Sequence, residues 1–166
     1  MLVLPIGLVL LVGPPAAGKS TFARELVRLG RIDAAGVVSA DAIRVELFGT
    51  AVRLADDPAV FGEVDARIAA RLAATLPVVV DATNVTPAAR RRARSFGGPV
   101  SALRFPVAGE VLVARNAARP VPVATDVVAR LITAFQEDAS LEQLRAEGYA
   151  VAADVPAADL VTFARP

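Results

Sequence analysis

The sequence predicts an α/β fold in which a central, mostly parallel sheet of about five strands lies between two layers of helices. Short apolar runs alternate with helical patterns along the chain, and strands that alternate with helices are joined by right-handed crossovers into a parallel sheet. The chain has 166 residues, 55% of them hydrophobic, which suits one domain with a substantial core. We find no repeat, low-complexity linker or second domain, and therefore expect a single domain over residues 1–166.

Five apolar runs are expected to form the strands. The first, Ile6 to Val12, follows an apolar stretch from Met1 and is typical of the buried central strand of a parallel sheet. This stretch is interrupted by Pro5 and Gly7, is too short to span a bilayer, and has no basic segment before it as a signal peptide would. We therefore expect a cytoplasmic protein. The other strands are expected at residues 37–39, 77–81, 100–105 and 160–163.

The helices are expected between these strands. Two of them open with a polar residue followed by proline, Asp57-Pro58 and Thr86-Pro87, which is the pattern of an N-cap and a first helical residue. The helix from Asp57 carries an apolar residue at every fourth position. Further helices are expected at residues 21–27, 41–48, 109–118, 125–138 and from 140 to a stop at Gly148, with a helical lid at roughly 109–125.

The most specific motif lies after the first strand. Residues 13–20, Gly-Pro-Pro-Ala-Ala-Gly-Lys-Ser, fit G-x-x-x-x-G-K-[ST] in full, and this strand–loop–helix context is that of a phosphate-binding loop (P-loop) of nucleotide hydrolases and kinases. The glycines let the backbone curl around a phosphate, and the start of the helix contributes backbone N–H groups and a positive dipole end. The sequence thus predicts the three-layer sandwich of P-loop NTPases.

Lys19 is the only lysine of the chain, which indicates a position that needs a compact ammonium group. We expect Lys19 to reach the β- and γ-phosphates and the Ser20 hydroxyl to hold Mg²⁺. The cofactors are therefore expected to be ATP, or another NTP, and Mg²⁺. The loop residues expected to bind the nucleotide are Gly13, Pro14, Pro15, Ala16, Ala17, Gly18, Lys19, Ser20 and Thr21.

The composition excludes several kinds of chemistry. Since the chain has no Cys and no His, it has no disulfide, no Cys/His zinc site, no cysteine nucleophile and no histidine acid–base catalyst. A net charge of +1 excludes a global electrostatic footprint for nucleic acid, so any such site must be a local groove. Catalysis must depend on carboxylates, arginines, Lys19, hydroxyls and a metal held by oxygen ligands.

Two acids follow predicted strands, where ligands of such a sheet bind. Asp41 is either the N-cap of its helix or a general base that takes the proton of an acceptor hydroxyl. Arg44 lies on the same helix face and either pairs with Asp41 or binds an acceptor phosphate. Asp81 is placed to orient a water bound to Mg²⁺, although Asp81 and Asn84 are also explained as turn residues.

Two groups of arginines are candidates for contacts with phosphate groups. Arg115 and Arg119 are four residues apart on one helix face, which suits a lid that closes over a triphosphate, but also a solvated basic face. The densest positive cluster, at residues 90–94, is either a solvated surface or a contact for a phosphodiester backbone. Aromatic residues are few; Phe105, Phe135 and Tyr149 are the nearest candidates for base stacking, although most phenylalanines are expected in the core.

These motifs together resemble the polynucleotide 5′-kinase family, the kinase domains of phage and bacterial end-healing enzymes. The resemblance runs in order over residues 8–149, from the P-loop through Ser39-Ala40-Asp41, Asp81-Ala82-Thr83-Asn84 and Arg115-Asn116-Ala117-Ala118-Arg119 to Val121-Pro122 and residues 145–149. The D-A-T-N and R-N-x-x-R elements are more discriminating than the P-loop alone. This kinase is often accompanied by phosphatase or ligase domains, for which we expect no counterpart within residues 1–166.

The resemblance implies an ATP-dependent transfer of the γ-phosphate to the 5′-hydroxyl of RNA or DNA. It implies that Lys19, Ser20 and Thr21 bind ATP and Mg²⁺ and that Asp41 is the general base. The acceptor side would consist of Asp41, Arg44, Asp81, Asn84 and Arg90, and Arg119 would lie nearest the γ-phosphate, beside Arg115. Two alternatives keep the P-loop: a small-molecule kinase, such as an antibiotic phosphotransferase or a zeta-type toxin, and an ATPase switch.

Overall fold

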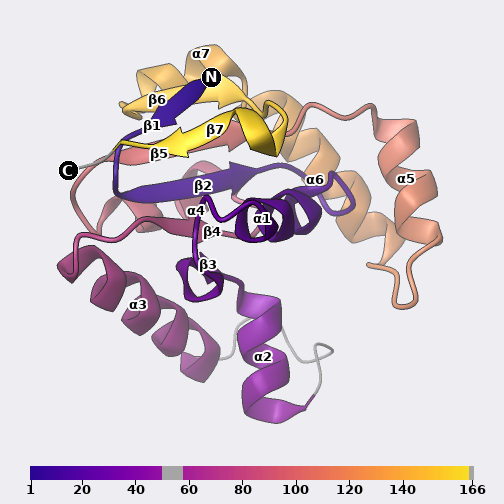
Figure 1. Ribbon diagram of the computed structural model, residues 1–166. Helices are drawn as coiled ribbons and strands as arrows, with labels where there is room; N and C mark the ends of the chain where they lie inside the picture. The colour runs from indigo at the N-terminus through magenta and orange to yellow at the C-terminus, as the bar shows by residue number, and fades with distance from the viewer. Residues whose placement is uncertain (50–57, 165–166) are drawn as a thin grey trace.

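A computed structural model describes residues 1–49 and 58–164 and confirms the α/β architecture (Figure 1). The central sheet is parallel throughout, in the order β3-β4-β2-β5-β6. Because β2 lies in the middle, the loop that follows it opens at the centre of the carboxyl edge of the sheet. The strands are β2 (Leu8–Val12), β3 (Val37–Val38), β4 (Val78–Val80), β5 (Val100–Arg104) and β6 (Val151–Asp154).

The helices begin and end close to the predicted positions. Thr86 is the N-cap of its helix, as predicted, and its side chain accepts a hydrogen bond from the backbone N–H of Ala89. Ser140 forms a capping box with Gln143 at the start of the last helix. The predicted N-cap Asp57 lies outside the described residues. The α-helices are α1 (Lys19–Arg28), α2 (Ala40–Phe48), α3 (Pro58–Ala73), α4 (Pro87–Arg94), α5 (Gly109–Ala117), α6 (Thr125–Asp138) and α7 (Leu141–Ala146).

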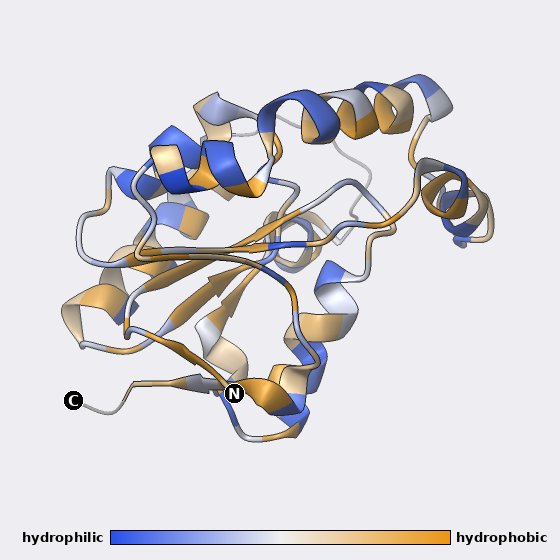
Figure 2. Ribbon diagram, turned by 90° about the horizontal axis from the view of Figure 1, so that it is seen from above, coloured by the Kyte–Doolittle hydropathy of each residue, from blue (hydrophilic) through white to orange (hydrophobic). Residues whose placement is uncertain are grey.

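The core has two halves, one on each face of the sheet. Side chains of β2 alternate between them, because successive residues of a strand point to opposite faces. Leu8, Leu10 and Val12 pack with residues of α2, α3, α4, α6 and α7, whereas Val9 and Leu11 pack with α1 and α5. Figure 2 shows the result, with orange strands inside and blue outer helix surfaces. Among the described helices, none combines the length and the apolar character that a membrane span requires.

Two expectations about the strands are wrong. The apolar N-terminal stretch does not form one strand: Leu2–Leu4 is a separate strand, β1, which pairs in parallel with β7 (Val161–Phe163) in a small second sheet. The predicted last strand is therefore not part of the central sheet. Its place is taken by β6, which was not predicted, because the Val-Ala-Ala-Asp sequence of this edge strand carries little apolar pattern. Backbone pairing with β5 defines β6 instead.

Candidate active site

The P-loop curls tightly between β2 and α1, as the motif predicts. Gly18 adopts a φ of 97°, a left-handed conformation that glycine adopts without strain. Gly13 is required for another reason, because a Cβ atom there would lie 2.9 Å from the Cβ of Phe105. Ala16 also has a positive φ, 65°, which is costly for a residue with a side chain and is typical of functional loops.

Lys19 is buried at the start of α1, and its Nζ donates to the backbone oxygens of Gly13 and Pro14, both at 2.7 Å. Burial lowers the pKa of Lys19 to about 8, because desolvation disfavours the ammonium form. Three further charges act on this pKa: Asp81 and Asp41 raise it, and Arg119 lowers it. The fold thus brings together four residues that are far apart in the sequence.

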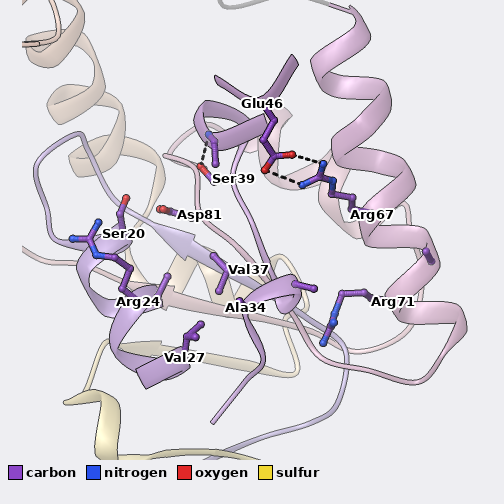
Figure 3. Close-up of a pocket in the computed structure, with 14 residues that line it drawn as sticks. Ser20, Arg24, Val27, Ala34, Val37, Ser39, Glu46, Arg67, Arg71 and Asp81 are labelled. Carbon is purple, nitrogen blue, oxygen red and sulfur yellow. Dashed lines mark hydrogen bonds and ion pairs between the residues drawn. The ribbon is translucent and has the colours of Figure 1, made fainter. Parts of the chain in front are cut away.

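The loop that follows β4 is bound to the base of the P-loop. The backbone N–H of Gly13 donates to the Thr83 oxygen at 2.9 Å, and the side-chain amide of Asn84 donates to the Leu11 oxygen at 3.0 Å. Asn84 is buried, with a left-handed φ of 50°, so its amide group serves the fold by joining the two loops. The consequence is a fixed position for Asp81 beside Ser20 (Figure 3).

Asp41 is an exposed residue in the first turn of α2. The cap of this helix is Ser39, whose side chain accepts from the Ala42 N–H, so the capping alternative for Asp41 is wrong. Arg44 donates to the Asp41 carboxylate at 2.6 Å; the arginine is 7% exposed and the aspartate 77%. Among the described residues, the buried Nε of Arg44 has no hydrogen-bond partner. A carboxylate open to solvent is thus held by a guanidinium that is itself buried.

The residues near Lys19 fit Mg²⁺ bound mainly by a substrate. Within the described part of the chain no three acidic side chains gather into a metal site. Ser20 and Asp81 line the same cavity. One hydroxyl and one carboxylate suit Mg²⁺, which keeps several waters and takes its other ligands from phosphate oxygens.

Arg115 lies on the last turn of α5 and Arg119 two residues beyond its end. Both are exposed, and within the described residues neither guanidinium has a hydrogen bond or an ion pair. Asn116, between them, is buried and holds the following loop through two hydrogen bonds with the backbone of Val123, at 2.8 and 3.1 Å. The structure therefore fixes the backbone around this pair and leaves its charges available.

A cavity of about 500 Å³ extends from the P-loop toward α5. Its lining includes Arg115, Pro156 and Ala157, together with Gly18 and Thr21 of the P-loop region. Pro156 and Ala157 were missed in the sequence because they follow β6, the strand that was not predicted. Had β6 been recognised, the rule that ligands bind at the carboxyl ends of strands would have identified them.

Arg90 does not reach this region, and its predicted role in acceptor binding is wrong. Its side chain is fully buried and forms an ion pair with Glu147 at 2.5 Å. It also donates to the backbone oxygens of Asn84, Val85 and Asp138.

The rest of the 90–94 cluster is also largely occupied. Arg92 pairs with Asp65, and Arg94 donates to the Glu147 backbone oxygen and lies over the Tyr149 ring. Phe105, Phe135 and Tyr149 are all buried in the core, so the base-stacking alternative for them is wrong.

Comparisons with known proteins identify the family and relatives of the fold. Residues 8–141 match the model of a family described as AAA domain (AAA_33). No curated protein matches the sequence. Chains from two structures of the Pnkp1/Rnl/Hen1 RNA repair complex are similar, one with a TM-score of 0.64 and 24% identity over 82% of this chain and 45% of that one, the other with 0.57 and 27% over 75% and 43%. The present chain thus spans less than half of these relatives.

Small-molecule kinases share the fold as well. A gluconokinase from Sinorhizobium meliloti has a TM-score of 0.61 and 18% identity, covering 95% of this chain and 88% of that one. These similarities, together with the family match, establish a P-loop kinase-like, nucleotide-binding fold.

Proposed function

The chain belongs to the AAA domain family that its sequence matches, and from this premise we propose that it is an ATP-dependent kinase for the 5′-hydroxyl ends of RNA or DNA. The observation that carries the proposal is that the charges of Asp41, Asp81 and Arg119 all act on the pKa of the buried Lys19. A nucleotide switch needs the lysine and Asp81 but has no use for the exposed carboxylate of Asp41.

The reaction follows from these positions. The acceptor oxygen attacks the γ-phosphorus, the bond from that phosphorus to the bridging oxygen breaks, and ADP leaves. Asp41 accepts the proton of the attacking hydroxyl, while Lys19 and Arg119 stabilise the charge on the transferring group. Ser20 and, through water, Asp81 would hold Mg²⁺ together with the triphosphate, and the ion would supply further positive charge. Residues 109–125 act as the lid that brings Arg119 to the γ-phosphate.

The cavity beside Arg115 suits the base of the donor nucleotide. It begins at the P-loop, where the phosphates end, and a planar guanidinium stacks well on a flat ring. Pro156 and Ala157 add an apolar part to its lining. This arrangement leaves the other side of the P-loop, where Asp41 and Asp81 lie, to the acceptor.

Two observations support a polynucleotide acceptor. The D-A-T-N and R-N-x-x-R elements occur in the order of end-healing kinases, and a chain of the Pnkp1/Rnl/Hen1 complex is 27% identical over 75% of this chain. In addition, the Arg44 guanidinium, which donates to the Asp41 carboxylate at 2.6 Å, adds a positive charge beside the proposed base, which suits an acceptor that carries a phosphate next to its hydroxyl.

A small-molecule acceptor is the second candidate, and one observation favours it. The arginine cluster at residues 90–94 is bound to acidic side chains and backbone oxygens, and in the described part of the chain only Arg91 of this cluster is unpaired. Among the described residues, this cluster therefore offers little free charge to a phosphodiester backbone, which favours an acceptor that is contacted at its terminal nucleotide or is itself small.

The test is transfer of labelled γ-phosphate from ATP to four acceptors: a 5′-OH RNA, a 5′-OH DNA, a nucleoside 3′-monophosphate and a panel of small alcohols. We expect transfer to the oligonucleotides. Asp41→Ala should abolish it and leave ATP binding near normal, since the carboxylate contacts the acceptor. Asp41→Asn is the matched control for shape, because it keeps a hydrogen bond to Arg44 and loses only the base.

Three outcomes contradict the proposal. Full activity of both Asp41 variants would exclude the proposed base. Transfer only to a small alcohol would establish the second candidate. ATP hydrolysis that is unchanged in Asp41→Ala and Arg44→Ala, without transfer to any acceptor, would indicate a nucleotide switch.

A further inference from the structure

The loop that follows α5 carries Arg119 and lies at the surface. Residues 117–122 are all exposed, and two of them, Pro120 and Pro122, have no backbone N–H to donate. The helix α5 itself lies at the periphery of the fold, beside α6 (Figure 1). An exposed loop of this kind needs a specific contact if it is to present a side chain in a fixed place.

The side chain of Asn116 supplies such a contact. It is 6% exposed, and its amide group spans the loop to Val123. The nitrogen of the amide donates to the Val123 backbone oxygen at 2.8 Å, and its oxygen accepts from the Val123 N–H at 3.1 Å. Because the two hydrogen bonds run in opposite directions, this Asn116–Val123 bridge fixes the orientation of the far end of the loop as well as its distance.

The two arginines on either side of Asn116 depend on this bridge to different degrees. Arg115 is in the last turn of α5, where the hydrogen bonds of the helix hold its backbone. Arg119 lies inside the bridged loop, and among the described residues the one hydrogen bond of its backbone N–H goes to the Asn116 backbone oxygen, at 3.2 Å. Loss of the bridge should therefore free Arg119 and leave Arg115 in place.

We propose that Asn116 is the positioning residue that holds Arg119 in place for the transferring phosphoryl group. The inference rests on the proposed function, in which Arg119 stabilises the charge on that group. Such stabilisation depends on donors that are in place before the reaction, and a displacement of about 1 Å costs on the order of 10²-fold in rate. Asn116 acts through the backbone of the loop, and Arg119 is the group that meets the phosphate.

The test compares the affinities for two ligands and requires no acceptor. ADP reports on the nucleotide site, whereas ADP with aluminium fluoride also mimics the phosphoryl group in transfer. Isothermal titration calorimetry in the presence of Mg²⁺ measures both affinities. We expect Asn116→Ala and Arg119→Ala each to weaken binding of the aluminium fluoride complex at least about tenfold, and to change the affinity for ADP alone by less than about twofold. The double variant should bind as Arg119→Ala does, because the bridge has no further effect once the guanidinium is gone.

Two control variants separate positioning from packing. Asn116→Leu keeps the approximate volume of the side chain and removes both hydrogen bonds, so it should behave as Asn116→Ala does. Ile68→Val removes a methyl group from the half of the core that α5 does not contact, and it should lower the melting temperature but leave both affinities unchanged. Hydrogen exchange of the Val123 amide should become faster in the two Asn116 variants and stay unchanged in Ile68→Val.

Three results would overturn the inference. The Asn116 variants could bind the aluminium fluoride complex as tightly as the native protein, they could weaken binding of ADP alone to the same extent, or their effect could multiply with that of Arg119→Ala. A failure of the proposed function gives a different result, in which the 5′-OH oligonucleotides receive no phosphate but binding of the aluminium fluoride complex still depends on Asn116 and Arg119.

Discussion

Two pairs of arginines have the same spacing in the sequence, but one pair is bound by acceptor oxygens in the fold and the other is exposed. Arg90 and Arg94 on α4, and Arg115 and Arg119 at the end of α5, are each four residues apart. Glu147 binds both members of the first pair. Its carboxylate forms an ion pair with Arg90, and its backbone oxygen accepts a hydrogen bond from the Arg94 side chain. The second pair is exposed, and its guanidinium groups have no partner among the described residues.

The difference shows that the use of an arginine depends on which acceptors lie within reach after folding. Arg90 is surrounded by carbonyl and carboxylate oxygens, and a buried guanidinium is tolerated only when it is satisfied in this way. Among the described residues Arg119 has no such hydrogen-bond or ion-pair partner, and its charge lowers the pKa of Lys19 instead. We therefore expect the α4 pair to serve stability and the α5 pair to serve function.

The largest expected effect is that of Arg90→Ala on stability. Removal of one partner of a buried ion pair costs about 3–5 kcal/mol, because Glu147 and several backbone oxygens lose their donor. For a domain of this size, the melting temperature should fall by roughly 10 °C. Thermal denaturation measures this fall in melting temperature. Arg91→Ala is the control: Arg91 is exposed and, among the described residues, unpaired, so its replacement should lower the stability by less than about 0.5 kcal/mol. An equal loss of stability in both variants would contradict a structural role specific to the buried Arg90.

Arg119→Ala should instead reduce turnover and leave stability unchanged. We expect kcat to fall by about 10²-fold or more, the magnitude typical of arginines that stabilise a transferring phosphoryl group. Steady-state kinetics with a 5′-OH oligonucleotide and thermal denaturation measure the two quantities. Arg145→Ala on α7 removes another exposed, unpaired arginine of the described chain and should change neither quantity.

Arg115→Ala tests the proposed stacking on the nucleotide base. Its loss should raise the KM for ATP by about tenfold, equivalent to roughly 1.4 kcal/mol, with a smaller effect on kcat. Arg115→Lys should restore only part of the affinity, because an ammonium group lacks the planar face of guanidinium. If the lysine variant matched the native protein, charge alone would account for the role of this residue.

The smallest expected effect is on the pH dependence of ADP binding. Only protonated Lys19 attracts the phosphates, and its pKa in the free protein is about 8. Affinity should therefore be constant at low pH and decline as the pH rises above about 8. Because the positive charge of Arg119 lowers this pKa, Arg119→Ala should shift the decline to higher pH. Titration with a fluorescent ADP analogue between about pH 6.5 and 9.5 measures the shift. An unchanged midpoint would show that the charge of Arg119 does not act on Lys19.

The sequence predicts well whatever depends on neighbours in the chain. The P-loop, its flanking strand and helix, and the caps at Thr86 and Ser140 all follow from local patterns. Prediction fails where pairing is between distant segments. The strand β6 has no apolar pattern of its own, and the N-terminal stretch divides because β1 finds a partner in β7.

The residues of the candidate site show the same difference between what the sequence predicts and what it does not. Lys19, Ser20, Asp41 and Asp81 are found from the sequence because each follows a strand or lies in a motif. The burial of Arg90, the link from Asn84 to Leu11 and the wall formed by Pro156 are not found, since each depends on an atom from a remote element.

The sequence alone determined the phosphate loop, the alternation of strands and helices, and the carboxylates at the strand ends, because these depend on backbone geometry and on contacts between near neighbours. Only the tertiary structure decided which arginines of the described chain are free and which charges act on Lys19. The physical reason is that a charged side chain is bound or available according to the oxygen atoms around it, and folding brings those atoms from distant parts of the chain.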